Sequence, residues 1–96
     1  MRTTYLVCYD ICDDKRLRKV AEICSDFGVR LQYSVFECDL DDSEKIVLNG
    51  KLEEVIDAGE DQVLYVSLGP TQGKALWGIT SLGLPYTRMA SPCYVL

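Results

Sequence analysis

Five apolar segments, which follow one another with alternating periodicity, constrain the fold of this chain more than any other feature. Residues 4–9, 29–40 and 62–68 are rich in β-branched and aromatic side chains, which is typical of strands. Between them, apolar residues recur at helical spacing over 17–27 and again over 47–56. The order is therefore strand, helix, strand, helix, strand, which is typical of an α+β sandwich.

Short polar residues, glycine and proline mark where these elements begin and end. Asp13 and Asp14 are candidate N-caps for the first helix, and Gly28 is predicted to end that helix in the C′ position. In the middle strand the hydrophobic alternation changes phase near Ser34, which predicts a bulge or tight bend and two short strands or one kinked strand. Gly59 is predicted to end the second helix, and Gly69-Pro70 to close the last core strand.

The predicted fold class is a ferredoxin-like βαββαβ sandwich, with two helices on one face of an antiparallel sheet. We expect a single domain over 1–96, with its core over 2–68 and a tail over 69–96 that contributes to dimer or partner contacts. The tail is expected to form at most short strands, around 79–82 and 93–96. The face of the sheet opposite the helices would stay exposed in a monomer. A second copy packed against it, face to face, would cover it, so we predict a homodimer.

Residue types that are missing from the sequence exclude several kinds of chemistry. The chain has no histidine, so serine–histidine, cysteine–histidine and ribonuclease-A-like mechanisms are excluded. Its five cysteines form no CxxC pair, which favours reduced, mostly buried thiols that act as small hydrophobic groups. Carboxylates with a divalent metal, or an activated water, remain for catalysis. With no recognisable signal peptide or membrane-length apolar segment, we expect a cytoplasmic protein.

The acidic residues are concentrated in the middle of the chain. The net charge is −5, and residues 34–66 carry ten acidic and two basic side chains. Residues 1–33, by contrast, carry six basic and five acidic side chains. The net charge therefore does not exclude contacts between the first third of the chain and nucleic-acid phosphates.

Asp10 is the candidate catalytic and metal-ligating residue, because it ends an apolar strand just before a helix begins. Its carboxylate could hold a hard cation such as Mg²⁺, and two of them across a dimer axis would make a better site than one. The alternative is that Asp10 helps to cap the helix. Arg16 and Arg18 lie at the helix start, where basic residues oppose the helix dipole. Their position indicates phosphate binding, pairing with neighbouring aspartates, or a solvated charged face.

Three stretches resemble the CRISPR-associated protein Two family, the small subunit of the machinery that acquires CRISPR spacers. They are Tyr9-Asp10-Ile11 with the aspartates and arginines that follow, Gly28-Val29-Arg30, and the segment from Gln32 to Cys38, which is the most specific. The resemblance covers residues 2–68. It implies a ferredoxin-like homodimer with Mg²⁺, for which Mn²⁺ can substitute, held between Asp10 and its symmetry mate.

The resemblance also implies an activity, partners and residue roles. The implied activity is metal-dependent endonuclease cleavage of single-stranded RNA or double-stranded DNA, within an integrase complex that holds prespacer duplex DNA and integrates new spacers. The alternatives are a purely structural scaffold of that complex, a toxin-type ribonuclease of related fold, and a ligand-binding regulatory domain. The residues that carry over are Asp10 as metal ligand, Arg16, Arg18 and Arg30 as phosphate contacts or transition-state stabilisers, and Phe36 as an aromatic that supports the site.

Overall fold

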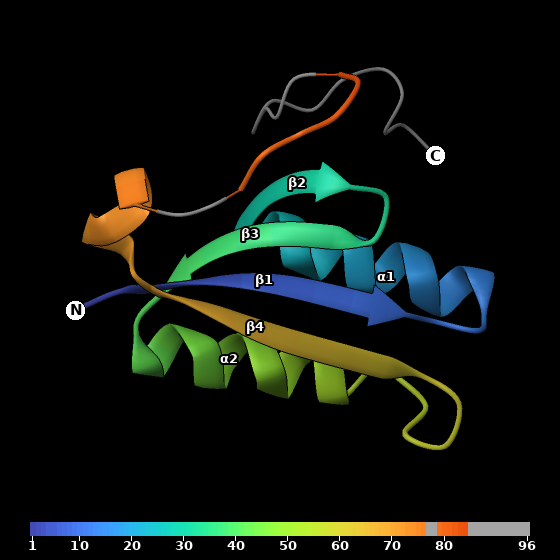
Figure 1. Ribbon diagram of the computed structural model, residues 1–96. Helices are drawn as coiled ribbons and strands as arrows, with labels where there is room; N and C mark the ends of the chain where they lie inside the picture. The colour runs from blue at the N-terminus through green and yellow to red at the C-terminus, as the bar shows by residue number, and fades with distance from the viewer. Residues whose placement is uncertain (77–78, 85–96) are drawn as a thin grey trace.

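A computed structural model describes residues 1–76 and 79–84 of the chain. These residues form four strands, two α-helices and a short 3-10 helix, and the strands and α-helices follow the predicted order (Figure 1). The elements are β1 (Thr3–Asp10), α1 (Asp14–Ser25), β2 (Gly28–Gln32), β3 (Val35–Leu40), α2 (Asp42–Glu53), β4 (Gln62–Pro70) and the 3-10 helix η1 (Thr71–Leu76).

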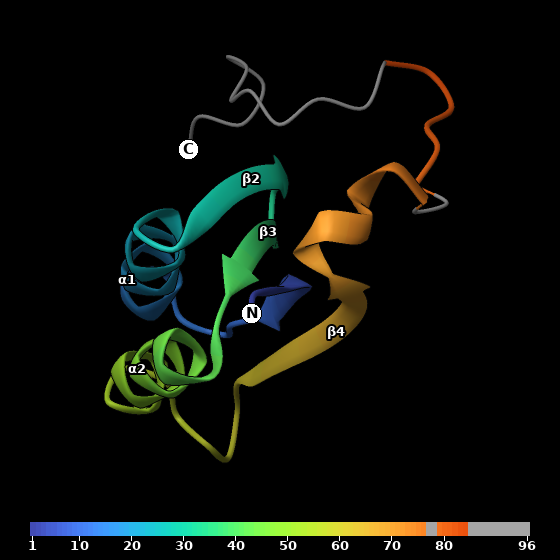
Figure 2. The same cartoon turned by 90° about the vertical axis from the view of Figure 1, so that its left-hand side faces the viewer.

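β1 is a central strand that pairs with two strands far away in the sequence. The sheet has the order β2-β3-β1-β4, and every neighbouring pair is antiparallel. Val7 of β1 lies opposite Phe36 of β3 on one side and opposite Tyr65 of β4 on the other. Figure 2 shows both helices on the same face of this sheet. The predicted ferredoxin-like α+β sandwich is therefore confirmed.

The core lies between the two helices and the covered face of the sheet. Residues alternate between the two faces of a strand, and in β1 this alternation buries Val7 and Tyr9 beneath the helices. Burying one large apolar side chain stabilises the fold by about 1.5–3 kcal/mol relative to leaving it exposed. The buried hydrophobic residues are Val7, Tyr9, Val20, Cys24, Phe36, Cys38, Leu40, Leu48 and Leu52.

The cysteines divide between core and surface. Cys24 and Cys38 are buried, and desolvation raises the pKa of both thiols to about 12. Cys8 is half-buried and Cys12 is exposed. The predicted role as buried hydrophobic thiols is confirmed for Cys24 and Cys38 but not for Cys12, whereas Cys93 lies outside the described residues.

The open face of the sheet, which is the face opposite the helices, carries exposed apolar side chains. Leu64 and Val66 of β4 are 50% and 43% exposed, and Val29 of β2 is 39% exposed. Leu6 of β1 lies opposite Val66 and therefore shares this face. An apolar surface of this kind is typical of a contact with another protein surface.

The division of the middle strand near Ser34 is confirmed. A turn at Tyr33 and Ser34 joins β2 to β3, since Gln32 lies directly opposite Val35. The pairing register also shifts between Arg30 and Gln32. This irregularity and the turn together account for the change of phase in the hydrophobic pattern.

Two predicted helix ends are wrong. α1 ends at Ser25, and Gly28 instead begins β2 without a positive φ. A Cβ at Gly28 would collide with the carbonyl oxygen of Glu37, so the close approach of β2 to β3 requires glycine there. α2 ends at Glu53 rather than at Gly59, whose N–H lies in a turn and donates to Asp57 Oδ1 at 2.8 Å.

The region around residue 70 also differs from the prediction. β4 continues through Gly69, which has a φ of +98°, to Pro70 instead of closing before them. Proline is tolerated because β4 is an edge strand of the described sheet. Residues 79–84 form no strand, so the strand predicted around 79–82 is wrong, and the one predicted at 93–96 lies outside the described residues. Within the described residues, no helix has the length and apolar character needed to cross a membrane.

Candidate functional site

Asp10 is the last residue of β1 and lies opposite Gln62, the first residue of β4. Its side chain is exposed and makes no hydrogen bond or ion pair with the part of the chain that the structure describes. By strand alternation it lies on the open face with Cys8, whereas Tyr9 is buried on the helix side. Asp10 could therefore accept a ligand from the open face without losing an existing contact.

Asp13, and not Asp10, caps α1. The Asp13 carboxylate accepts a hydrogen bond from the backbone N–H of Arg16 at 3.0 Å. This contact satisfies one of the free N–H groups at the helix start, which is the usual function of an N-cap. The alternative role for Asp10 as a helix cap is thus not what the structure shows.

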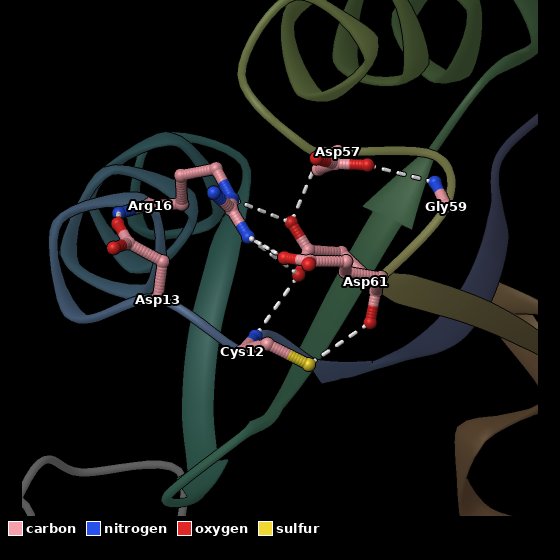
Figure 3. A network of polar contacts seen from close by, with 7 residues as sticks. Cys12, Asp13, Arg16, Asp57, Gly59 and Asp61 are labelled. Carbon is pink, nitrogen blue, oxygen red and sulfur yellow. Dashed lines mark hydrogen bonds and ion pairs between the residues drawn. The ribbon is translucent and has the colours of Figure 1, made fainter.

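Arg16 extends from the first turn of α1 to Asp61, the residue just before β4 (Figure 3). Its Nε donates to Asp61 Oδ2 at 2.8 Å and its Nη2 donates to Asp61 Oδ1 at 3.2 Å, which makes a bidentate pair. Nη2 also lies 3.2 Å from Glu60 Oε1. Two backbone N–H groups donate to the same aspartate, from Cys12 to Oδ1 at 2.9 Å and from Asp57 to Oδ2 at 2.8 Å.

The Asp61 side chain is 0% exposed, and its partners keep it ionised. Hydrogen bonds from Arg16, and then from the N–H groups of Asp57 and Cys12, hold the pKa of the Asp61 carboxyl well below its usual range, although burial acts in the opposite direction. The hydrogen bonds that Arg16 donates to Asp61 raise the pKa of the Arg16 guanidinium. Arg16 is therefore committed to a charge pair inside the protein.

The other basic residues of α1 face solvent. Lys15, Arg18 and Lys19 are exposed, and Lys19 lies 3.9 Å from Glu22 in an exposed pair. Arg18 makes no hydrogen bond or ion pair with residues 1–76 or 79–84. Among the three arginines predicted as phosphate contacts, Arg18 is the one with an exposed side chain.

Arg30 and Phe36 lie opposite each other on β2 and β3, and the guanidinium carbon is 5.1 Å from the ring centroid. Tyr9 stacks against the same ring, with 6.3 Å between the centroids and 26° between the planes. Tyr9 and Phe36 are buried on the helix side of the sheet, away from the face that Asp10 occupies. The structure thus brings Arg30 and Phe36 together with each other but not with Asp10, and their site roles stay predictions.

Asp61 and Cys12 are residues that the sequence reasoning missed. An aspartate followed two residues later by glycine, as in Asp57-Ala58-Gly59, is typical of a turn, and that turn presents Asp61 just ahead of a strand. Antiparallel pairing of β4 with β1 then places Asp61 at the same end of the sheet as Asp10. The turn at Asp57 to Gly59 is thus the signal in the sequence that points to Asp61.

The Asp10 carboxylate offers the oxygen ligands that Mg²⁺ prefers, but one carboxylate does not complete a site. Among the described residues, no group of three or more cysteine, aspartate or glutamate side chains is arranged to hold a metal ion. Asp10 is therefore a single candidate ligand for such an ion in one chain.

These features define a small ferredoxin-like α+β protein with an exposed carboxylate at the end of its first strand. Residues 2–75 match the family model of CRISPR associated protein Cas2. The chain belongs to the Cas2 family, which confirms the resemblance seen in the sequence.

Individual relatives extend over almost the whole chain. A Thermus thermophilus protein named CRISPR-associated endoribonuclease Cas2 is 38% identical over 96 residues, which cover 99% of this chain and 100% of the relative. A Rhodospirillum rubrum protein named CRISPR-associated endoribonuclease Cas2 1 is 36% identical over 92 residues, or 96% of this chain and 89% of the relative. The crystal structure of Streptococcus pyogenes Cas2 superposes with a TM-score of 0.71 at 34% identity, covering 83% of this chain and 99% of that one.

Proposed function

We propose that this protein is a metal-dependent endonuclease that works in the cytoplasm as a subunit of the CRISPR spacer-acquisition machinery. The observation that carries the proposal is the exposed Asp10 carboxylate at the end of β1, beside a basic helix start, in a chain without histidine. The names of the relatives, which call them endoribonucleases, support single-stranded RNA as a substrate. Double-stranded DNA, in the form of the prespacer duplex, is the second substrate that we propose.

In this proposed function, one group of side chains binds the metal ion and another binds the phosphates. Asp10, together with Asp10 of a second copy, would hold Mg²⁺ or Mn²⁺ through carboxylate oxygens. The cation, when bound, would supply positive charge at the scissile phosphate and lower the pKa of a water molecule. Arg18, with Lys15 and Lys19 beside it, would bind the neighbouring phosphates from the exposed side of α1.

A homodimer is part of the proposal, and the open face supports it. Leu64, Val66 and Val29 are exposed there although they are large and apolar. Covering apolar surface contributes about 25 cal/mol per Å², so packing two such faces together would favour association. Sedimentation that shows a stable monomer at micromolar concentration would contradict this part of the proposal.

A second candidate function is a purely structural role, as a scaffold that joins the integrase subunits and holds the prespacer duplex. One observation favours it: the described residues of a single chain contain no set of three metal-ligating side chains. A scaffold needs the phosphate contacts and the dimer, but it does not need Asp10.

One experiment separates these functions. Asp10→Asn would be compared with Asp26→Asn, an exposed carboxylate at the C-cap of α1, for cleavage of RNA and duplex DNA and for spacer integration with the partner integrase. For a nuclease we expect Asp10→Asn to lower cleavage by at least about 100-fold, as removal of a catalytic group often does. Lost cleavage with intact integration would indicate a scaffold in the cell. Equal cleavage by the two variants, or cleavage undiminished by EDTA, would contradict the proposal of a metal-dependent nuclease.

A further inference from the structure

Asp61 is a buried charge with an unusual number of donors. Its side chain is 0% exposed, and its two oxygens accept four hydrogen bonds, from the Cys12 and Asp57 N–H groups and from Nε and Nη2 of Arg16. Burying an ionised carboxylate is unfavourable unless it is paired and hydrogen-bonded, as it is here. A chain of 96 residues that maintains such a group has organised three separate segments around it.

Two of those segments adjoin Asp10 in the chain or in the sheet. Cys12 follows Asp10 by two residues, and its Sγ also donates to the carbonyl oxygen of Glu60 at 3.0 Å. On the other strand Gln62, which lies opposite Asp10, directly follows Asp61. Arg16 continues the same connection into the first turn of α1. The Asp61 carboxylate therefore holds the β1–α1 loop and the start of α1 against the loop before β4 (Figure 3).

We infer that Asp61 is a positioning residue for Asp10, and that it acts through the Cys12 N–H and the Arg16 guanidinium. Arg16 then serves this connection and not phosphate binding, because Nε and Nη2 are both occupied by carboxylates and the side chain is 26% exposed. Phosphate binding falls to exposed residues of α1 such as Arg18. The inference rests on the proposed function of Asp10 as a metal ligand.

The test compares Asp61→Asn with Asp57→Asn in the full-length protein. Asp57 lies in the same loop, and among the described residues its exposed carboxylate accepts a hydrogen bond from the Gly59 N–H only. The substitution Asp57→Asn leaves the backbone N–H that donates to Asp61 unchanged, so it is a matched control for the loss of a carboxylate. The first readout is Mn²⁺ binding, with Mn²⁺ alone as the probe and electron paramagnetic resonance as the measurement. We expect Asp61→Asn to weaken Mn²⁺ binding about 10- to 100-fold, the loss typical when a residue that orients a ligand is changed. Asp57→Asn should bind Mn²⁺ like the wild type.

The second readout is kinetic, and it distinguishes the role of Arg16 from that of Arg18. Asp61→Asn and Arg16→Lys should both lower kcat about 10- to 100-fold with little change in the KM for RNA, because lysine keeps the charge but not the bidentate geometry. Arg18→Ala should instead raise KM with little change in kcat. All rates would be measured where circular dichroism shows each variant to be folded. If Asp61→Asn did not fold at any temperature, Arg16→Lys would supply the same comparison.

The outcomes separate this inference from the function on which it rests. If Asp10→Asn binds Mn²⁺ as tightly as the wild type, the proposed metal site fails, and the inference fails with it. If Asp10→Asn loses Mn²⁺ while Asp61→Asn and Arg16→Lys both retain it, the inference alone is overturned. An Arg16→Lys protein with wild-type kcat and a raised KM would also overturn it, since Arg16 would then act as a phosphate contact.

Discussion

The two helices begin in the same way but use their third residue differently. Asp13 and Asp41 are N-caps, and each accepts a hydrogen bond from the backbone N–H three residues later, at 3.0 and 2.7 Å. In α2 that later residue is Glu44, whose Oε1 accepts from the Asp41 N–H at 2.9 Å and closes a capping box. In α1 it is Arg16, which points away from its own helix to the loop before β4.

Glu44 thus stabilises the start of its own helix, whereas Arg16 connects its helix to a loop that is distant in the sequence. A carboxylate in the first turn interacts favourably with the helix dipole, and a basic residue there does not. The start of α2 therefore stabilises α2 itself, whereas the start of α1 gives up part of that stabilisation to join two loops. Glu44 does form a salt bridge with Arg2 at 3.1 Å, but the two side chains are 34% and 53% exposed, and exposed pairs contribute about 0–1 kcal/mol.

We expect the largest effect on stability from the substitution Arg16→Glu. It would give α1 the capping box of α2 and would remove the ion pair between Arg16 and Asp61. We expect the unfolding temperature to fall by about 10 °C or more, since two carboxylates would then face each other at a buried position. Thermal unfolding followed by circular dichroism would measure it. Arg18→Glu makes the same charge change on the exposed side of α1 and should have little effect. Equal shifts in the two variants would mean that charge, and not the Asp61 contact, matters.

The pH dependence of stability should distinguish the two aspartates that the helix starts use. Hydrogen bonds to Arg16 lower the pKa of Asp61, and the N–H of Glu44 lowers that of Asp41. Each carboxylate adds stability that is fully present above the pKa of the unfolded chain, about 3.9, and that is lost as the pH falls through the lower folded-state pKa.

Because the pKa of Asp61 is lowered further than that of Asp41, Asp61→Asn should flatten the loss of stability in acid more than Asp41→Asn does. Urea unfolding between about pH 6 and pH 2 would measure the slope of the free energy of unfolding against pH. A variant lacking the Asp61 charge that kept the wild-type slope would show that Asp61 titrates alike in the folded and unfolded chains.

The smallest effect should come from Glu44→Gln. Glutamine can complete a capping box as glutamate does, so we expect the free energy of unfolding to change by less than about 0.5 kcal/mol in chemical denaturation. Glu44→Ala, which removes the acceptor, should be more destabilising. If the two variants were equally destabilised, the charge of Glu44 and its pairing with Arg2 would outweigh the hydrogen bond.

Features that depend on neighbouring residues could be predicted from the sequence, and those that depend on distant residues could not. The strand before Asp10, the cap at Asp13 and the turn at Ser34 each follow from local periodicity or turn chemistry. The partner of Arg16 lies 45 residues further along the chain, and no local pattern encodes that contact.

The predicted end of α2 is wrong for a different reason. Val55 and Ile56 pack against the core and so continue the apolar spacing after the helix has ended at Glu53. The spacing of apolar residues shows which side chains are buried or partly buried, and here those side chains continue past the end of the helix. The prediction for Gly28 is wrong for a similar reason, because a glycine required by a close strand approach looks the same in sequence as one that ends a helix.

The pairing of β1 with β4 affects the order in which the candidate site is completed during translation. A ribosome releases the N-terminus first, so β1, α1, β2 and β3 emerge before the loop that carries Asp61. Until β4 follows, Arg16 and the Cys12 N–H have no Asp61 to bind, and Asp10 ends a strand with one open edge. A nascent chain therefore carries its candidate catalytic residue before it has the means to hold it in place, and translation of β4 completes the end of the sheet that β1 began.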